Sequence, residues 1–128
     1  MTFLLDAHTF LWFIAGDKRL SSTARALIED PDNRSLISAA SLWEIAIKTS
    51  LGRLSLALPF DDLIAEQIRI NGFGILWIEV SHLKFLIDLP IRHRDPFDRL
   101  IVAQAIAEEI ALISADEALD LYEVKRLW

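Results

Sequence analysis

The stretch LLDAHTFLW, residues 4–12, decides the fold class because it joins an apolar run to a second apolar run through one carboxylate, Asp6. The run TFLLD, residues 2–6, has the length and character of a strand buried on both faces of a sheet. The following segment AHTFLWFIAG indicates a helix that ends at Gly16, since glycine commonly closes helices. A charge at the end of a buried strand therefore needs an explanation.

Strand-like and helix-like segments alternate along the rest of the chain, and serine, aspartate, proline and glycine mark the helix ends. The alternation predicts right-handed βαβ units, and so an α/β fold with a parallel sheet between helices on both faces. Beyond the first pair, we expect helices at residues 22–30, 39–52, 60–72, 81–89, 95–110 and 116–124, and strands at residues 35–38, 74–80, 111–114 and 125–128.

Length and composition favour a single globular domain over residues 1–128. Apolar residues make up 53% and charged residues 25%, which argues against disorder. The absence of cysteine excludes a disulfide scaffold and a cysteine nucleophile, and it is compatible with the cytoplasm, where we expect this protein to act. No apolar run is long enough to span a membrane. The net charge of −6 argues against broad, nonspecific binding of nucleic acid.

Acidic residues recur where strands end and helices begin, and those ends share one edge of such a sheet. They are Asp6, Glu44, Asp95, Asp98 and Asp116. Each also has a purely structural interpretation. The aspartates at 6, 95 and 116 are candidate helix caps, the SLWE segment at 41–44 matches a capping box, and the aspartate at 98 suits a positive helix end. The structural interpretation leaves their recurrence on one edge unexplained.

Carboxylates that meet at one edge would need protons or a cation. Two of them about 5 Å apart repel by roughly 3 kcal/mol at an effective dielectric constant of about 20. Oxygen-rich sites suit Mg²⁺ or Mn²⁺, whereas three histidines without a cysteine do not suggest a structural zinc site. The sequence therefore predicts a site where Asp6 helps to anchor a divalent ion.

Four motifs, in this order and at this spacing, resemble the PIN-domain ribonucleases, and more narrowly the VapC-type toxins of type II toxin–antitoxin pairs. They are LLDAHTFLW at the start, SAASLWEIAIK around Glu44, HRDPFDRLIVAQA around Asp98, and LISAD at Asp116. The resemblance covers essentially the whole chain. It implies a PIN-like three-layer α/β/α sandwich whose central parallel sheet has the strand order 3-2-1-4-5.

The resemblance also implies an endoribonuclease that hydrolyses RNA phosphodiester bonds with the help of Mg²⁺ or Mn²⁺. It places the catalytic, metal-binding acids at Asp6, Glu44, Asp98 and Asp116, and leaves open which of them touch the ion directly. Ser114 matches the small hydroxyl residue beside the last acid and could orient a water or ligand. Asp95, next to Pro96, is better explained as a helix cap than as a metal contact.

An acidic centre needs cations nearby if it is to accept RNA. His93 and four basic residues beside the acids are candidates for RNA binding, although surface solubility explains them equally well: Lys48, Arg92, Arg94 and Arg99. Lys48 follows Glu44 at the i,i+4 spacing of a helical ion pair. His8 is more readily a packing residue than a catalytic base. Trp12, Phe13 and Trp43 are expected in the core or an interface more than under a nucleobase.

The resemblance implies a cognate antitoxin that fills the acidic cleft, and homodimers that are sometimes built into larger toxin–antitoxin assemblies. No membrane partner is expected. Two other functions fit parts of the pattern. A phosphatase of the haloacid-dehalogenase type needs a second aspartate two residues after the first, where this chain has His8, and a receiver domain needs paired acids after its first strand. A noncatalytic binding module with capped helices would bind no divalent ion and cleave no RNA.

Overall fold

A parallel sheet of five strands forms the centre of the computed structural model, which describes residues 1–128. The strand order is β3-β2-β1-β4-β5, and every neighbouring pair is parallel. The predicted fold class and strand order are therefore confirmed. The strands are β1 (Thr2–Leu5), β2 (Arg34–Ser38), β3 (Gly74–Leu76), β4 (Ala111–Ile113) and β5 (Arg126–Leu127).

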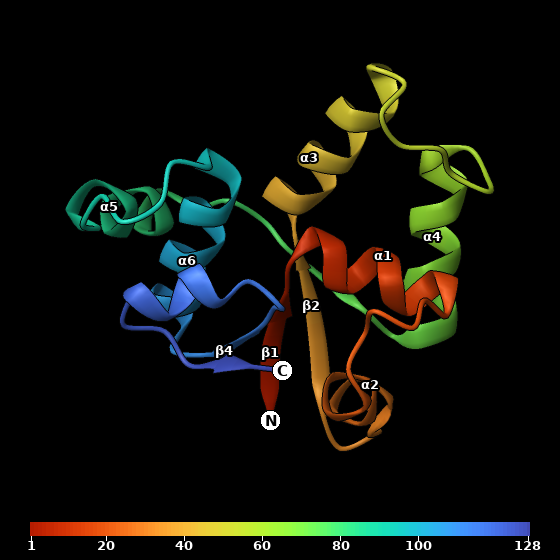
Figure 1. Cartoon of the computed structure of the whole chain (residues 1–128), viewed down its shortest axis with the longest axis horizontal. Helices are drawn as coiled ribbons and strands as arrows, with labels where there is room; N and C mark the ends of the chain where they lie inside the picture. Colours follow the sequence, from red (N-terminus) through yellow and green to blue (C-terminus); the bar gives the residue numbers. More distant parts are fainter.

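Helices cover both faces of this sheet (Figure 1). One face carries α1, α2 and α4, the other carries α5 and α6, and α3 rises from the end of β2 (Figure 1). None of the helices combines the length and apolarity needed to cross a membrane. The helices are α1 (Ala7–Ala15), α2 (Ser22–Glu29), α3 (Ala39–Ser50), α4 (Phe60–Asn71), α5 (Val80–Asp88), α6 (Pro96–Glu108) and the 3₁₀ helix η1 (Glu117–Leu121).

Alternate residues of β1 build the two halves of the core. Phe3 and Leu5 pack with residues of α1 and α4, whereas Leu4 packs with Ile101 of α6 on the opposite face. These three of the four side chains of β1 are fully buried. Because side chains alternate between the faces of a strand, this pattern needs helices on both sides of β1. β1 is therefore central, and its carboxyl end lies between the ends of β2 and β4.

Two predicted elements are shorter than expected. The strand predicted at 74–80 ends at Leu76, because the Glu79 amide donates a hydrogen bond to His82 Nδ1 at 3.0 Å and so begins α5. The helix predicted at 116–124 is the short 3₁₀ helix η1. Leu119 within η1 and Tyr122, the residue that ends it, are both buried in the core. Both predictions were wrong in extent and right in position.

Candidate active site

One cavity of about 320 Å³ at the carboxyl edge of the sheet collects the predicted acids. Asp6 follows β1, Glu44 lies in the second turn of α3, Asp98 in the first turn of α6, and Asp116 just after β4. These elements converge because β1, β2 and β4 are neighbours in the sheet. Asp95 lines the same cavity, so the structure brings together all five acids that the sequence singled out.

Asp6 is held in one orientation by two hydrogen bonds. Its Oδ1 accepts from the Thr9 amide at 2.8 Å, which makes it the N-cap of α1, and its Oδ2 accepts from Ser114 Oγ at 2.5 Å. Ser114 is fully buried, and its Oγ also accepts from the Asp116 amide at 3.1 Å. The capping interpretation of Asp6 therefore holds alongside its place in the cavity. Ser114 links the two acids that follow β1 and β4.

Glu44 does not form the predicted capping box with Ser41. The helix begins at Ala39, as predicted, and Ser38 is its N-cap, accepting from the Ala40 amide at 3.0 Å. Glu44 is instead in the second turn, where it is 8% exposed and its Oε2 accepts from Lys48 Nζ at 2.7 Å. The buried Glu44 carboxylate is thus turned to the cavity with one cation beside it.

Asp98 carries most of the electrostatic strain of the site. The pKa of its carboxyl is raised from 3.8 to about 7, mainly by burial and next by the charge of Asp95; Glu44 and Asp6 contribute to the rise, and His93 opposes it. Asp95 itself caps α6, accepting from the amides of Phe97 at 2.8 Å and Asp98 at 3.2 Å. A dication in the cavity would favour the ionised form of Asp98 by offsetting these like charges.

His93 belongs to this site, although its sequence position suggested only one of several basic residues. Its Nδ1 accepts from the Asp95 amide at 3.0 Å, so its Nε2 carries the proton in the neutral ring. Nε2 lies 3.3 Å from Asp116 Oδ2 and 3.5 Å from Asp98 Oδ2. The ring therefore lies between two acids from different elements. In the sequence, the one indication of this role was the position of His93 two residues before Asp95, the cap of α6.

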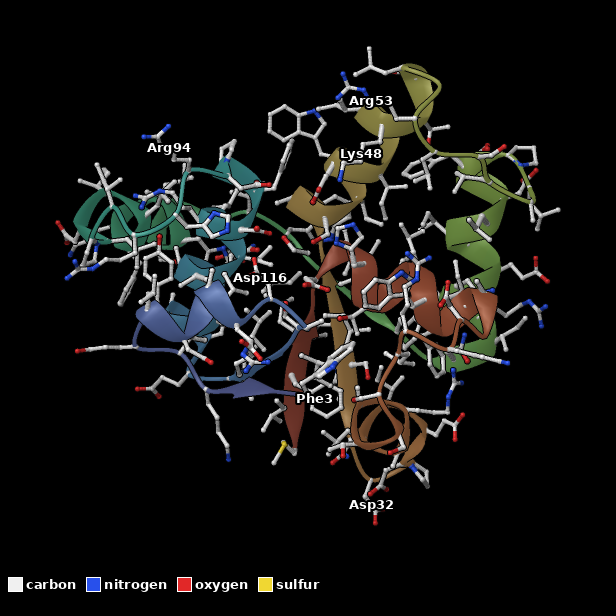
Figure 2. All side chains as sticks on the ribbon, viewed as in Figure 1. Phe3, Asp32, Lys48, Arg53, Arg94 and Asp116 are labelled. Carbon is white, nitrogen blue, oxygen red and sulfur yellow. The ribbon has the colours of Figure 1, made fainter.

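Of the predicted RNA-binding cations, only Lys48 lines the acidic cavity. Arg99 turns away, donating to the carbonyl oxygens of Pro90 at 2.9 Å and Leu89 at 3.4 Å. Arg92 lines a different cavity on the α5 side, and Arg94 points outward, well apart from Asp116 (Figure 2). The predicted cluster of arginines beside the acids therefore does not form, because the loop before α6 uses its backbone to bind Arg99.

A second hollow of about 270 Å³ adjoins the acidic cavity and contains Arg53, which sequence analysis did not single out. The two hollows share Ala7, His8, Glu44 and Lys48. Figure 2 shows Lys48 on the last turns of α3 and Arg53 on the turn that follows this helix. Arg53 lies beyond Gly52, where the helical pattern has already ended, so spacing from Glu44 gave no sign of it.

The aromatic residues divide between the cavity wall, the core and the surface. His8 stacks on Trp12 with their ring centroids 5.6 Å apart, and both line the acidic cavity. Phe13 packs against the core with Phe73, as expected. Trp43 is 58% exposed and meets Phe97 edge-on at 5.1 Å, so it lies at the surface where α3 approaches α6.

Comparison with known proteins agrees with this geometry. A family model described as "PIN domain" matches residues 3–126. This chain belongs to the PIN-domain family. Within it the chain is of the VapC type, being 34% identical over 122 residues to Ribonuclease VapC22 of Mycobacterium tuberculosis, with 92% of this chain and 89% of that relative covered. The family resemblance expected from the four sequence motifs is confirmed.

Solved structures share the fold of this PIN domain at low sequence identity. VapBC2 from Rickettsia felis, bound to a promoter DNA fragment, matches with a TM-score of 0.74 and 15% identity, covering 99% of this chain and 98% of that chain. VapBC-1 from nontypeable Haemophilus influenzae matches with a TM-score of 0.66 and 14% identity, covering 99% and 97%. At such identities the likeness establishes the fold alone.

The donor set of this PIN domain fits a hard divalent cation. Asp6, Glu44, Asp98 and Asp116 offer carboxylate oxygens, and Asp98, Asp116 and His93 have potential ligand atoms within 4.8 Å of one another. In the tautomer described above, His93 presents a proton at Nε2 and so supports the acids as a donor. An oxygen-rich set of this kind suits Mg²⁺ or Mn²⁺.

Proposed function

We propose that this PIN domain, comprising residues 1–128 as one domain, is a divalent-metal-dependent endoribonuclease and the toxin of a toxin–antitoxin pair. The observation that carries the proposal is the convergence of four carboxylates from four different elements on one cavity. A relative that is a ribonuclease and structural neighbours that are VapBC complexes support the proposal. RNA in the cytoplasm is the proposed substrate.

In the proposed mechanism, Asp6 and Asp98 hold Mg²⁺ or Mn²⁺ directly or through water, and Glu44 and Asp116 complete the set. When bound, the ion neutralises phosphate charge and lowers the pKa of water. The hydrogen bonds from Thr9 and Ser114 keep the Asp6 carboxylate aimed at the cavity. One carboxylate would accept the proton of the attacking water, the water oxygen would bond to phosphorus, the bond from phosphorus to the leaving ribose oxygen would break, and that oxygen would take a proton from solvent.

Lys48 is the basic residue best placed to meet a phosphate at the acidic cavity, and Arg53 follows it in the adjoining hollow. The ammonium of Lys48 lies 2.7 Å from Glu44 and can reorient toward an arriving phosphate. Exposed Arg94 suits only a more distant phosphate, and Arg92 and Arg99 are directed elsewhere. The proposed RNA contacts therefore rest on α3 more than on the loop before α6.

The decisive experiment compares RNA cleavage by the wild type and by Asp6→Asn with Mg²⁺ or Mn²⁺, and with EDTA as the metal-free condition. The amide keeps the shape of the side chain but removes the charge, so cleavage is expected to fall by at least about a hundredfold. Asp32→Asn is the matched control, because Asp32 is exposed in the turn at the opposite edge of the sheet (Figure 2). Equal cleavage by wild type and Asp6→Asn would defeat the mechanism, and no cleavage by either would favour a noncatalytic module.

The proposed antitoxin would place a basic side chain in the acidic cavity and apolar side chains in the adjoining hollow between α1 and α3. Leu11, Ile45 and Leu54 line that hollow. Trp12 forms part of the cavity wall. Trp12→Glu is expected to abolish antitoxin binding while leaving the circular dichroism of the folded chain unchanged; retained binding would count against this surface.

A homodimer is the proposed assembly, with larger toxin–antitoxin complexes built from it. The segment entering α5 and one face of α5 expose apolar side chains, with Val80 at 83% and Ile87 at 81% exposure. Trp77 and Leu83 extend the same surface. Exposed apolar patches of this kind mark association surfaces. Light scattering should give the dimer mass for the wild type and the monomer mass for Val80→Glu, and a monomeric wild type would contradict the proposal.

A further inference from the structure

Three polar side chains are completely buried away from the acidic cavity, between α3, α5 and α6. They are Ser38, His82 and Gln104. Burial of polar atoms is unfavourable unless each atom has a hydrogen-bonding partner. Every buried side-chain nitrogen and oxygen in this protein does have one. The three residues therefore form a hydrogen-bonded network between α3, α5 and α6. The proposed chemistry does not use them.

The centre of this connection is the bond from Ser38 Oγ to Gln104 Oε1, at 2.5 Å. Ser38 Oγ also accepts a hydrogen bond from the Ala40 amide as the N-cap of α3. The hydroxyl proton of Ser38 is therefore the one donated to Gln104 Oε1. Gln104 Nε2 lies 3.4 Å from the Trp77 carbonyl oxygen and 3.3 Å from His82 Nδ1. The amide of Gln104 is thus held at both of its ends.

The connection continues into α5. His82 Nδ1 accepts from the Glu79 amide at 3.0 Å, and His82 Nε2 lies 2.8 Å from Glu108 Oε1. The start of α5 is thereby bonded to the end of α6. Movement of Gln104 relative to α3 or α5 would therefore break several hydrogen bonds of this network.

The helices that Ser38 and Gln104 join are the ones that carry two of the proposed metal ligands. Ser38 caps α3, and Glu44 follows it by six residues; Gln104 follows Asp98 in α6 by the same number. A helix transmits position along its axis as a stiff element, at 1.5 Å per residue. The Ser38–Gln104 bond therefore fixes the relative placement of the Glu44 and Asp98 carboxylates.

The hydrogen bond between Ser38 and Gln104 opposes electrostatic repulsion between α3 and α6. Glu44 and Asp98 face the same cavity as like charges, and their repulsion acts to separate α3 from α6. Cations with strict coordination geometry bind poorly when ligands spread apart. We propose that Gln104, through its hydrogen bond with Ser38, is a positioning residue that sets the spacing of Glu44 and Asp98 for the divalent cation. This inference rests on the proposed metal site.

Calorimetric titration with Mn²⁺ tests the inference, using wild type, Gln104→Met, Ser38→Ala and the double variant. Methionine keeps the length of glutamine without its amide, and alanine removes only the hydroxyl, so Ser38→Ala keeps the test open if Gln104→Met does not fold. Removal of groups that orient metal ligands typically weakens metal binding about 10- to 100-fold. We expect about a tenfold loss of Mn²⁺ affinity in each single variant, and no further loss in the double variant than in Ser38→Ala, because Ser38→Ala already removes the bond to Gln104 together with the N-cap bond to the Ala40 amide.

Thermal unfolding in EDTA separates positioning from general stability. Asn33→Ala is the control, since Asn33 Nδ2 donates to the Leu27 carbonyl at 3.0 Å at the opposite edge of the sheet. It should lower the melting temperature without changing Mn²⁺ affinity. Unchanged Mn²⁺ affinity in both Gln104→Met and Ser38→Ala would overturn the inference. Absence of Mn²⁺ binding by the wild type would instead overturn the proposed metal site, so the two failures are distinguishable.

Discussion

Replacing Asp98 with asparagine should stabilise the metal-free protein while removing its response to divalent ions. The side chain is 21% exposed, and its carboxyl pKa is raised from 3.8 to about 7 by burial and then by the charge of Asp95. Ionised Asp98 therefore lowers the free energy of unfolding. Asparagine has nearly the same shape and no charge, so Asp98→Asn removes this penalty.

The size of the effect follows from the pKa. Each unit of difference between folded and unfolded chains corresponds to about 1.4 kcal/mol, so the upper limit is about 4 kcal/mol. Solvent screening reduces it, and we expect Asp98→Asn to gain about 2 kcal/mol in the absence of metal, or about 5–8 °C in melting temperature.

The sign of the pH dependence is fixed by the raised pKa. The folded state retains the Asp98 proton over a range where the unfolded chain has lost it, so the wild type loses stability as pH rises from about 4 to about 7. The advantage of Asp98→Asn should therefore be small near pH 4 and largest above pH 7.

Differential scanning calorimetry in EDTA at pH 4 and pH 8, repeated at pH 8 with Mn²⁺, measures both effects. Mn²⁺ at about a hundred times its dissociation constant should add about 2.7 kcal/mol to the wild type and far less to Asp98→Asn. Asp32→Asn is the control for removing an exposed carboxylate. The reasoning is refuted if Asp98→Asn melts at or below the wild-type temperature at pH 8 without metal, or if both proteins respond equally to Mn²⁺.

Three further substitutions test other parts of the site and fold. Ser114→Ala should cost about 1–2 kcal/mol of stability and reduce RNA cleavage about tenfold, since Ser114 Oγ bonds both Asp6 and the Asp116 amide; unchanged calorimetry and kinetics would contradict this. Lys48→Met should raise KM for RNA about tenfold and lower the melting temperature of the metal-free protein, because it leaves the buried Glu44 carboxylate without its cation; an unchanged KM would contradict this role. Gly16→Ala should cost about 1 kcal/mol by urea unfolding, because Gly16 closes α1 at φ 63°, and an unchanged midpoint would refute the strain.

Local patterns predicted much of this protein because they report local physics. The apolar run of β1, the helix stop at Gly16 and the caps at Asp6 and Asp95 all depend on neighbours within a few residues. The alternation of elements implied a parallel sheet, and a parallel sheet brings strand ends to one edge. The order of the strands, by contrast, followed from family resemblance and not from the alternation of elements.

Long side chains were the least predictable from sequence. Arg99 was expected beside the acids, yet it binds carbonyl oxygens of the loop before α6. Glu44 lines the cavity, and the alternative in which it caps a helix is wrong because Ser38 is the cap. His93 looked like one of several basic residues, yet its ring lies between Asp98 and Asp116. Each of these outcomes depends on partners that are distant along the chain or on where a helix begins.

The sequence by itself determined which segments are strands and helices, and that charged side chains stand where strands end, because burial and capping act over one or two turns of chain. Only the tertiary structure decided that Ser38 meets Gln104, that Ser114 bonds Asp6, and that His93 lies beside Asp116. Hydrogen bonds between residues far apart in sequence form only after the helices have packed, and no spacing along the chain encodes them.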